Sequence, residues 1–144
     1  MRAVLDNLCA LQRAYLEYMR NYLGADCAHP KQGPILCMLL ELEGTSQAEL
    51  TRRLNVSAAT VTVSIGRLER LGYVRRHRNP QNRRAYELTL TAEGYAQAVK
   101  LNRAMNSACK QAVIDISPIE LNRLCELLER MADNLHGQCV QKDA

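Results

Sequence analysis

"SQAELTRRLNVSAATVTVSIGRLERLGYVRRHRNPQNRR", residues 46–84, is the stretch that decides the fold. Its part from residue 51 to residue 84 contains nine arginines and a single acidic residue, Glu69. This segment has a net charge of +8 in a chain of net charge +4, so the remaining residues sum to −4. A single-signed basic segment on an acidic remainder favours a module that faces nucleic acid over an ordinary solvated charged surface.

Two short helices joined by a tight turn are predicted for the first half of this stretch. Ser46 and Glu49 have the spacing of a capping box, in which the hydroxyl accepts from the residue-49 amide and the carboxylate can reach back. The first helix ends near residue 54, and residues 55–56 make a turn. Ser57 then caps a second helix that runs to residue 71, and a glycine closes it.

The sequence period changes after residue 72. In residues 85–90, Tyr, Leu and Leu alternate with Ala, Glu and Thr, which is the period of a strand with one buried face. Residues 73–78 are also rich in strand formers, and "NPQNRR" between the two runs is a turn. The stretch is therefore predicted to be a winged helix-turn-helix with arginine at and beside the wing tip.

Amphipathic helices flank this unit on both sides. They are predicted over residues 2–23, 30–43, 92–114 and 118–136, with Gly137 ending the last one and residues 138–144 fraying. The expected fold is mainly α with a small β-hairpin, in the order α-α-α-α-β-β-α-α. We expect a DNA-binding domain over 30–91 and a helical dimerisation region over 1–29 and 92–137.

Composition excludes several classes of protein. The chain has no apolar run long enough to span a membrane, and charged residues interrupt its first twenty positions, so neither a membrane protein nor a signal peptide is predicted. Its six cysteines form no CxxC pair, and reduced thiols in the cytoplasm are expected. The sequence contains no phosphate loop, nucleophile elbow or paired carboxylates, and we therefore expect no enzyme and no cofactor.

The second helix of the pair is predicted to be the reading helix. Its apolar positions, with those of the bracing helix, form a shared core: Leu50, Leu54, Val56, Val61, Ile65, Leu68 and Leu71. Small side chains remain on the outward face, where they allow close approach to base edges, and arginines surround them as phosphate contacts. The candidate DNA contacts are Arg52, Arg53, Ser57, Ala58, Thr60, Thr62, Ser64, Arg67, Arg75, Arg76, Arg78, Arg83 and Arg84.

Residues 46–94 resemble the core of the MarR family of bacterial transcriptional regulators. The similar motifs are "LERLGYVR" at 68–75, "NRR" at 82–84 and "LTAEG" at 90–94. The resemblance implies a homodimer with interdigitated terminal helices, binding a pseudo-palindromic double-stranded DNA operator as a repressor. It places Arg84 at the wing tip in the minor groove, assisted by Arg83. Asn82 stands where the family usually has Asp, which implies a looser and more positive wing.

The signal to which such a regulator responds is left open by the sequence. A small-molecule effector bound near Tyr15, Tyr18 and Tyr22 is one alternative, and thiol oxidation at Cys9 is a second. Both are weighed against plain packing, in which Cys9, Cys37, Cys109 and Cys125 are small core residues. No recognisable metal spacing links the Cys27–His29 segment to Glu41 or His136. A winged helix used only for protein contact is the alternative class of function.

Overall fold

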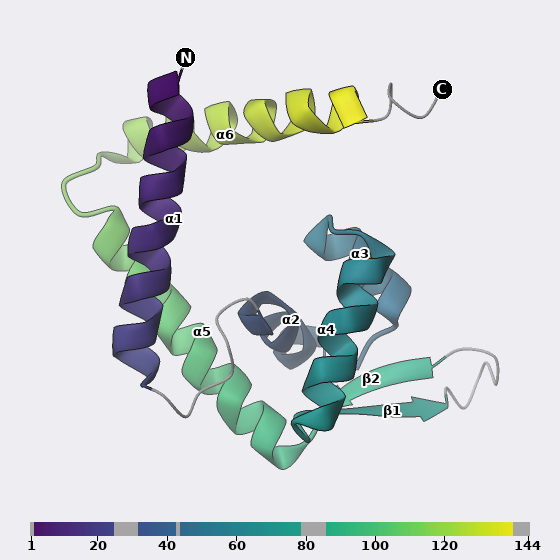
Figure 1. The fold of residues 1–144 in the computed structure, drawn as a ribbon. Helices are drawn as coiled ribbons and strands as arrows, with labels where there is room; N and C mark the ends of the chain where they lie inside the picture. The colour runs from purple at the N-terminus through teal and green to yellow at the C-terminus, as the bar shows by residue number, and fades with distance from the viewer. Residues whose placement is uncertain (1, 25–31, 43, 79–85, 140–144) are drawn as a thin grey trace. The chain divides into compact units, whose positions relative to one another are not determined.

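The computed structural model describes residues 2–24, 32–42, 44–78 and 86–139, with side chains through residue 135 (Figure 1). The predicted order of helices and strands is confirmed. No helix in these ranges is both long enough and apolar enough to cross a membrane. The elements are α1 Arg2–Leu23, α2 Gly33–Leu42, α3 Gln47–Leu54, α4 Ala58–Arg70, β1 Val74–Arg78, β2 Tyr86–Leu90, α5 Ala92–Ala112 and α6 Pro118–Cys139.

Hydroxyl caps begin α3 and α4 where the sequence predicts them, and a third begins α5. Ser46 Oγ accepts from the Glu49 amide at 3.1 Å, and Ser57 Oγ accepts from the Thr60 amide at 3.1 Å. Thr91 Oγ1 accepts from the amide of Gly94 at 2.9 Å. Each bond satisfies one of the amide donors that a helix start leaves without an intrahelical partner.

The end of α6 differs from the prediction. Gly137 does not end this helix, which continues to Cys139. A glycine inside a helix costs only about 1 kcal/mol relative to alanine, so a nearby cluster of good helix formers can carry the helix through it. Residues 138–139, predicted to fray, are thus helical, and the rest of the predicted tail lies outside the described residues.

The wing is an antiparallel pair in which Val74 lies opposite Leu90 and Arg76 opposite Leu88. Alternation along the strands places residues 74, 76 and 78 on one face with residues 86, 88 and 90. This face is the inner one, because Val74 and Leu88 are both buried. Thr45 exchanges two backbone hydrogen bonds with Leu88, at 3.1 and 2.7 Å, and so attaches the start of α3 to the wing.

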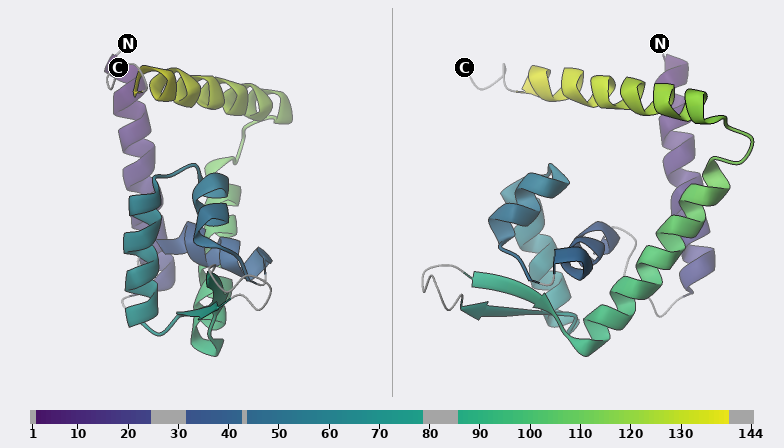
Figure 2. Two further views of the ribbon diagram at one scale, coloured as in Figure 1. Left: turned by 90° about the vertical axis from the view of Figure 1, so that its right-hand side faces the viewer. Right: turned by 180° about the vertical axis from the view of Figure 1, so that it is seen from behind.

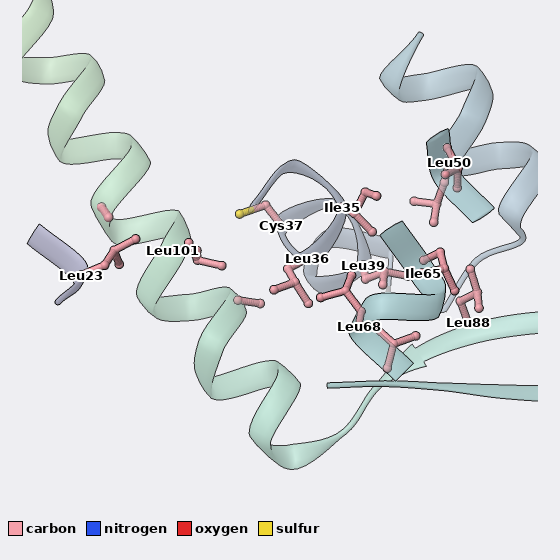
Figure 3. Packing of buried hydrophobic residues seen from close by; sticks show 14 of the residues in the cluster. Leu23, Ile35, Leu36, Cys37, Leu39, Leu50, Ile65, Leu68, Leu88 and Leu101 are labelled. Carbon is pink, nitrogen blue, oxygen red and sulfur yellow. The ribbon is translucent and has the colours of Figure 1, made fainter. Parts of the chain in front are cut away.

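The core of the first unit lies around α2 (Figure 3). Leu36 and Leu39 of α2 meet Ile65 and Leu68 of α4, and the whole group is nearly inaccessible to solvent. The predicted shared core is confirmed for Leu50, Val61, Ile65 and Leu68, and Leu54 packs partly buried against it. It is wrong for Val56 and Leu71, which are 39% and 52% exposed because they lie at the turns that flank α4.

Helix α1 packs on the core through its C-terminal half, where Tyr15 and Tyr18 are partly buried. Met19 and Leu23 are its buried side chains, whereas Val4, Leu11 and Tyr22 are exposed. Its C-terminal end is held by Lys100 of α5, whose Nζ donates to the Leu23 carbonyl at 3.0 Å. A lysine at the carbonyl end of a helix also compensates the helix dipole.

Hydrogen bonds attach the start of α5 to the base of the wing. The Thr91 amide donates to the Tyr73 carbonyl at 3.0 Å, and Thr91 Oγ1 donates to the Gly72 carbonyl at 2.6 Å. A Cβ on Gly94 would lie 1.9 Å from the Tyr73 carbonyl oxygen, so only glycine fits there. Close backbone contact thus links α4, the wing and α5 in one place.

The chain divides into two compact units, residues 1–108 and residues 109–144. The second unit is essentially α6, which begins with a complete capping box. The Ser117 amide donates to Glu120 Oε2 at 2.9 Å, and the Glu120 amide donates back to Ser117 Oγ at 3.3 Å. None of the described side chains of α6 is buried.

Candidate nucleic-acid interface

The two arginines of α3 are held by one carboxylate. Glu49 accepts from Arg52 Nε and Nη2 at 3.0 and 2.6 Å, and from Arg53 Nε at 2.6 Å. These bonds lower the pKa of Glu49 to about 2, and the Arg52 pKa is raised in return. The carboxylate is therefore used to orient arginines, in addition to standing at the capping-box position. Arg52 and Arg53 stay exposed, at 70% and 44% of their side chains.

The turn between α3 and α4 is tight because Asn55 adopts a left-handed conformation, with φ of 50°. Asparagine tolerates this region better than most residues. The next helix starts at once, and Ser57 Oγ contacts Thr60 Oγ1 at 2.8 Å in addition to capping. The predicted helix-turn-helix geometry is thus present between residues 47 and 70.

The outward face of α4 carries small side chains. Ser57, Ala58, Thr60 and Thr62 are exposed, and Ser64 is half-buried. Thr62 Oγ1 donates to the Ala58 carbonyl at 2.8 Å, so its methyl group is the part left free to meet a ligand. Such a face lets a helix backbone approach base edges in a major groove.

Two members of this face are missing from the candidates drawn from the sequence. Val63 is 55% exposed beside Thr62, and Gln47 of α3 donates its side-chain amide to Thr62 Oγ1. Val63 could have been found from spacing, because it lies off the stripe formed by Val61, Ile65 and Leu68. No local signal in the sequence indicates the Gln47 contact, which spans fifteen residues.

The remaining arginines fall into two groups. Arg67, Arg75 and Arg78 are exposed, and so is Arg70, whose Nε donates to the Gly66 carbonyl at 3.1 Å. Arg76 is different, because it pairs with Glu69 of α4 and lies over the ring of Tyr86. Arg83 and Arg84, the predicted wing tip, lie outside the described residues together with Asn82.

Cys9 is exposed on α1, and Tyr15 and Tyr18 are partly buried there. Tyr18 shares a hydrogen bond with Ser107 at 2.9 Å, and its ring stacks on that of Tyr22 at a centroid distance of 6.1 Å. This arrangement is packing between two helices of one unit.

The cysteines do not behave alike. Cys37 is a core residue, with its Sγ 3.8 Å from Met105 Sδ, and burial followed by the charge of Glu41 raises the pKa of its thiol. Cys9, Cys109 and Cys125 are exposed, so the prediction that they are core residues is wrong. Among the described residues no three metal-binding side chains gather, and Cys27 and His29 lie outside them.

A comparison with family models matches residues 29–86 to the MarR family. This range covers α2, α3, α4 and β1, and it ends at Tyr86, the first residue of β2. Residues 29–86 are thus similar in sequence to the MarR family. The resemblance seen in the "LERLGYVR" motif at 68–75 is thereby confirmed, and the "LTAEG" motif at 90–94 lies beyond the matched range.

One relative is similar in sequence over most of this chain. The chain is 28% identical over 103 residues to the uncharacterized HTH-type transcriptional regulator YdgJ of Bacillus subtilis (strain 168). The match covers 72% of this chain and 63% of that protein, less than two thirds of its length.

Solved structures share the fold. One is the PcaV transcriptional regulator of Streptomyces coelicolor in complex with its natural ligand, with a TM-score of 0.74, 24% identity and coverage of 88% and 89% of the two chains. Another is a mutant MarR from E. coli complexed with operator DNA, with a TM-score of 0.74, 20% identity and coverage of 90% and 93%. At this identity the likeness establishes the winged helix architecture.

Proposed function

We propose that this chain is a transcriptional regulator that binds a pseudo-palindromic operator in double-stranded DNA as a homodimer and acts as a repressor. The observation that carries the proposal is the row of small exposed side chains at the N-terminal part of α4, surrounded by exposed arginines. A helix surface of this kind, with a bracing helix and a wing beside it, matches the requirements of major-groove reading.

Each part of the face has a role in this proposal. Ala58, Thr60 and Thr62 approach base edges, where methyl groups meet thymine and hydroxyls meet hydrogen-bonding atoms. Arg52, Arg53 and Arg67 contact phosphates, which supply affinity and register. Arg84 and Arg83 enter the minor groove, following the family resemblance, because narrow grooves have enhanced negative potential.

Exposed apolar side chains support the dimer. Helix α6 exposes Leu124, Leu127, Leu128 and Leu135, and α1 exposes apolar side chains in its own unit. Single chains rarely leave so much apolar surface open, and two-fold pairing buries it with one self-complementary patch. In this proposal residues 1–29 and 92–137 assemble the dimer and residues 30–91 bind DNA.

The test is selection of DNA from a random duplex library, followed by affinity measurement for the selected site. Ala58 and Ala92 offer a matched pair, because each is the exposed first residue of a helix behind a hydroxyl cap. Ala58→Glu should weaken binding by about tenfold or more through repulsion from DNA, while Ala92→Glu should change it little. Equal effects of the two substitutions would contradict the assignment of α4 to DNA reading.

Salt dependence separates this function from the alternative of a protein-interaction module. Displacement of counterions by phosphate contacts makes log affinity fall with log salt, by about 0.9 per contact. A steep fall supports the regulator. A flat response, or no enriched sequence from the library, supports a winged helix used for protein contact.

For the signal, we propose a small-molecule effector that releases the DNA. Two observations support this: PcaV, which shares the fold, was solved with its natural ligand, and Tyr15, Tyr18 and Tyr22 gather aromatic surface on α1. The exposed thiol of Cys9 favours oxidation as the second candidate. Release of DNA by peroxide, reversed by reductant and lost in Cys9→Ser, would decide for oxidation.

A further inference from the structure

We propose that Arg76 is a positioning residue for the wing and not a phosphate contact. In this inference Glu69 of α4 and Tyr86 of β2 hold its guanidinium, and the three side chains fix the angle between α4 and the hairpin. The inference rests on the proposed DNA-binding function. It also corrects the expectation that every arginine on β1 faces DNA.

The strand register separates Arg76 from its neighbours. Arg76 pairs with Leu88, so it lies on the inner face of the hairpin with the buried Val74 and Leu88. Arg75 lies opposite Thr89 on the other face. The two adjacent arginines therefore leave the strand in opposite directions, and only Arg76 leaves it toward the helices.

Arg76 contacts both α4 and the second strand of the hairpin. Its Nε lies 3.2 Å from Glu69 Oε1 and its Nη2 lies 3.4 Å from Glu69 Oε2, which is a forked pairing of two donors with two oxygens. Its Cζ lies 5.8 Å from the centre of the Tyr86 ring, within the range of a cation–π contact. One guanidinium thus bridges the C-terminal part of α4 and the second strand.

Glu69 has a position that fits this role. It is the single acidic residue among the nine arginines of residues 51–84, in a region where each acid opposes DNA binding by charge. Its side chain and that of Arg76 are only 32% and 35% exposed. An acid at this place is explained if the orientation that it provides outweighs its repulsion of phosphate.

Charge removal gives opposite predictions for the two roles. If Arg76 contacts phosphate, Glu69→Gln releases it and removes a negative charge, so affinity for the selected duplex rises. If Arg76 positions the wing, Glu69→Gln lowers affinity, by about fivefold from the usual strength of one partly exposed ion pair with a cation–π contact.

Glu87→Gln is the matched control, because Glu87 lies on the opposite face of the same hairpin, across from His77. It removes the same charge from the wing and should leave affinity unchanged or slightly raised. A fall with Glu69→Gln but not with Glu87→Gln supports the positioning role. A rise with both substitutions overturns it.

The salt slope gives a second, independent readout. Arg75→Ala should reduce the slope by about 0.9 per protomer, as expected for a lost phosphate contact, while Arg76→Ala should lower affinity at an unchanged slope. The charge-swapped double variant Glu69→Arg with Arg76→Glu should recover part of the affinity. Equal slope changes for Arg75→Ala and Arg76→Ala would overturn the inference.

A failure of the inference about Arg76 can be told apart from a failure of the proposed function. If the unmodified protein binds no selected duplex, the proposed function fails before any variant is compared. Circular dichroism melts of the same variants show whether each one folds. If Arg76→Ala does not fold, Glu69→Gln against Glu87→Gln still decides.

Discussion

Helices α4 and α6 are both amphipathic, yet they use their apolar sides in different ways. Val61, Ile65 and Leu68 of α4 are completely buried against α2 and the wing. The leucines of α6 remain exposed, and Ile119 at its start is 81% accessible. The apolar side of α4 is buried within its own unit, so its opposite face remains exposed and can bind a ligand. The second helix, α6, exposes an apolar face, which the proposed dimer would cover.

The largest effect is expected where α4 is buried. Ile65→Ala should reduce the free energy of unfolding by about 3 kcal/mol, because it leaves a cavity among tightly packed side chains. Val63→Ala, on the exposed face of the same helix, should change it by less than about 0.5 kcal/mol. Urea unfolding at fixed protein concentration measures both, and similar losses would show that α4 is not anchored as described.

A change on α6 should act on assembly. Leu124→Lys should weaken self-association by about tenfold or more, because the lysine must be desolvated in the proposed dimer interface. Asn122→Lys is the control, since it adds the same charge on the polar side of the helix. Sedimentation velocity over a dilution series measures both. An unchanged dimer in Leu124→Lys would remove α6 from the interface.

The caps of the two helices allow a smaller comparison. Ser57→Ala and Ser117→Ala each remove a hydroxyl that accepts from an amide, at 3.1 and 3.3 Å. Each should cost about 1 kcal/mol of unfolding free energy. The Ser117 variant should also loosen α6, and the Ser57 variant α4, as seen in amide hydrogen exchange. Protection that falls equally in both helices for either variant would contradict two separate units.

The smallest effect concerns pH. The ion pairs of Glu49 lower its pKa from 4.5 to about 2, so their contribution to stability is complete above pH 4.5 and is lost as pH falls toward 2. Glu49→Gln lacks this contribution. The stability gap between wild type and Glu49→Gln should therefore be wider at pH 5 than at pH 3 in urea unfolding. A gap that stays constant would mean that the pairs with Arg52 and Arg53 do not form in solution.

Local patterns predicted most of the fold. The starts of α3 and α4 followed from caps at Ser46 and Ser57, and the strands followed from alternation, because these signals act between residues close in sequence. The family motifs lie in the same stretch. The end of α6 was not predicted correctly, because a glycine can either end a helix or lie within one.

The site was predicted less completely, because its geometry depends on contacts between distant residues. Strand alternation places Arg75 and Arg76 on opposite faces, but only the structure shows that Arg76 takes the inner face with the buried Val74 and Leu88. Nor could the sequence tell which cysteines are buried. Cys9 and Cys37 both lie at apolar helical positions, and the packing around α2 separates them.

Because of this difference between the thiols, the rate at which Cys37 is modified measures how often the core opens. Cys37 lies beside Met105 with a thiol pKa raised by burial, whereas Cys9, Cys109 and Cys125 are accessible. Only the thiolate reacts with alkylating reagents, so the exposed thiols should be modified first in the native protein. Cys37 should then react at the rate at which the helices around it separate. A time course of alkylation resolved by mass would report, without any engineered probe, how often the winged helix unit opens.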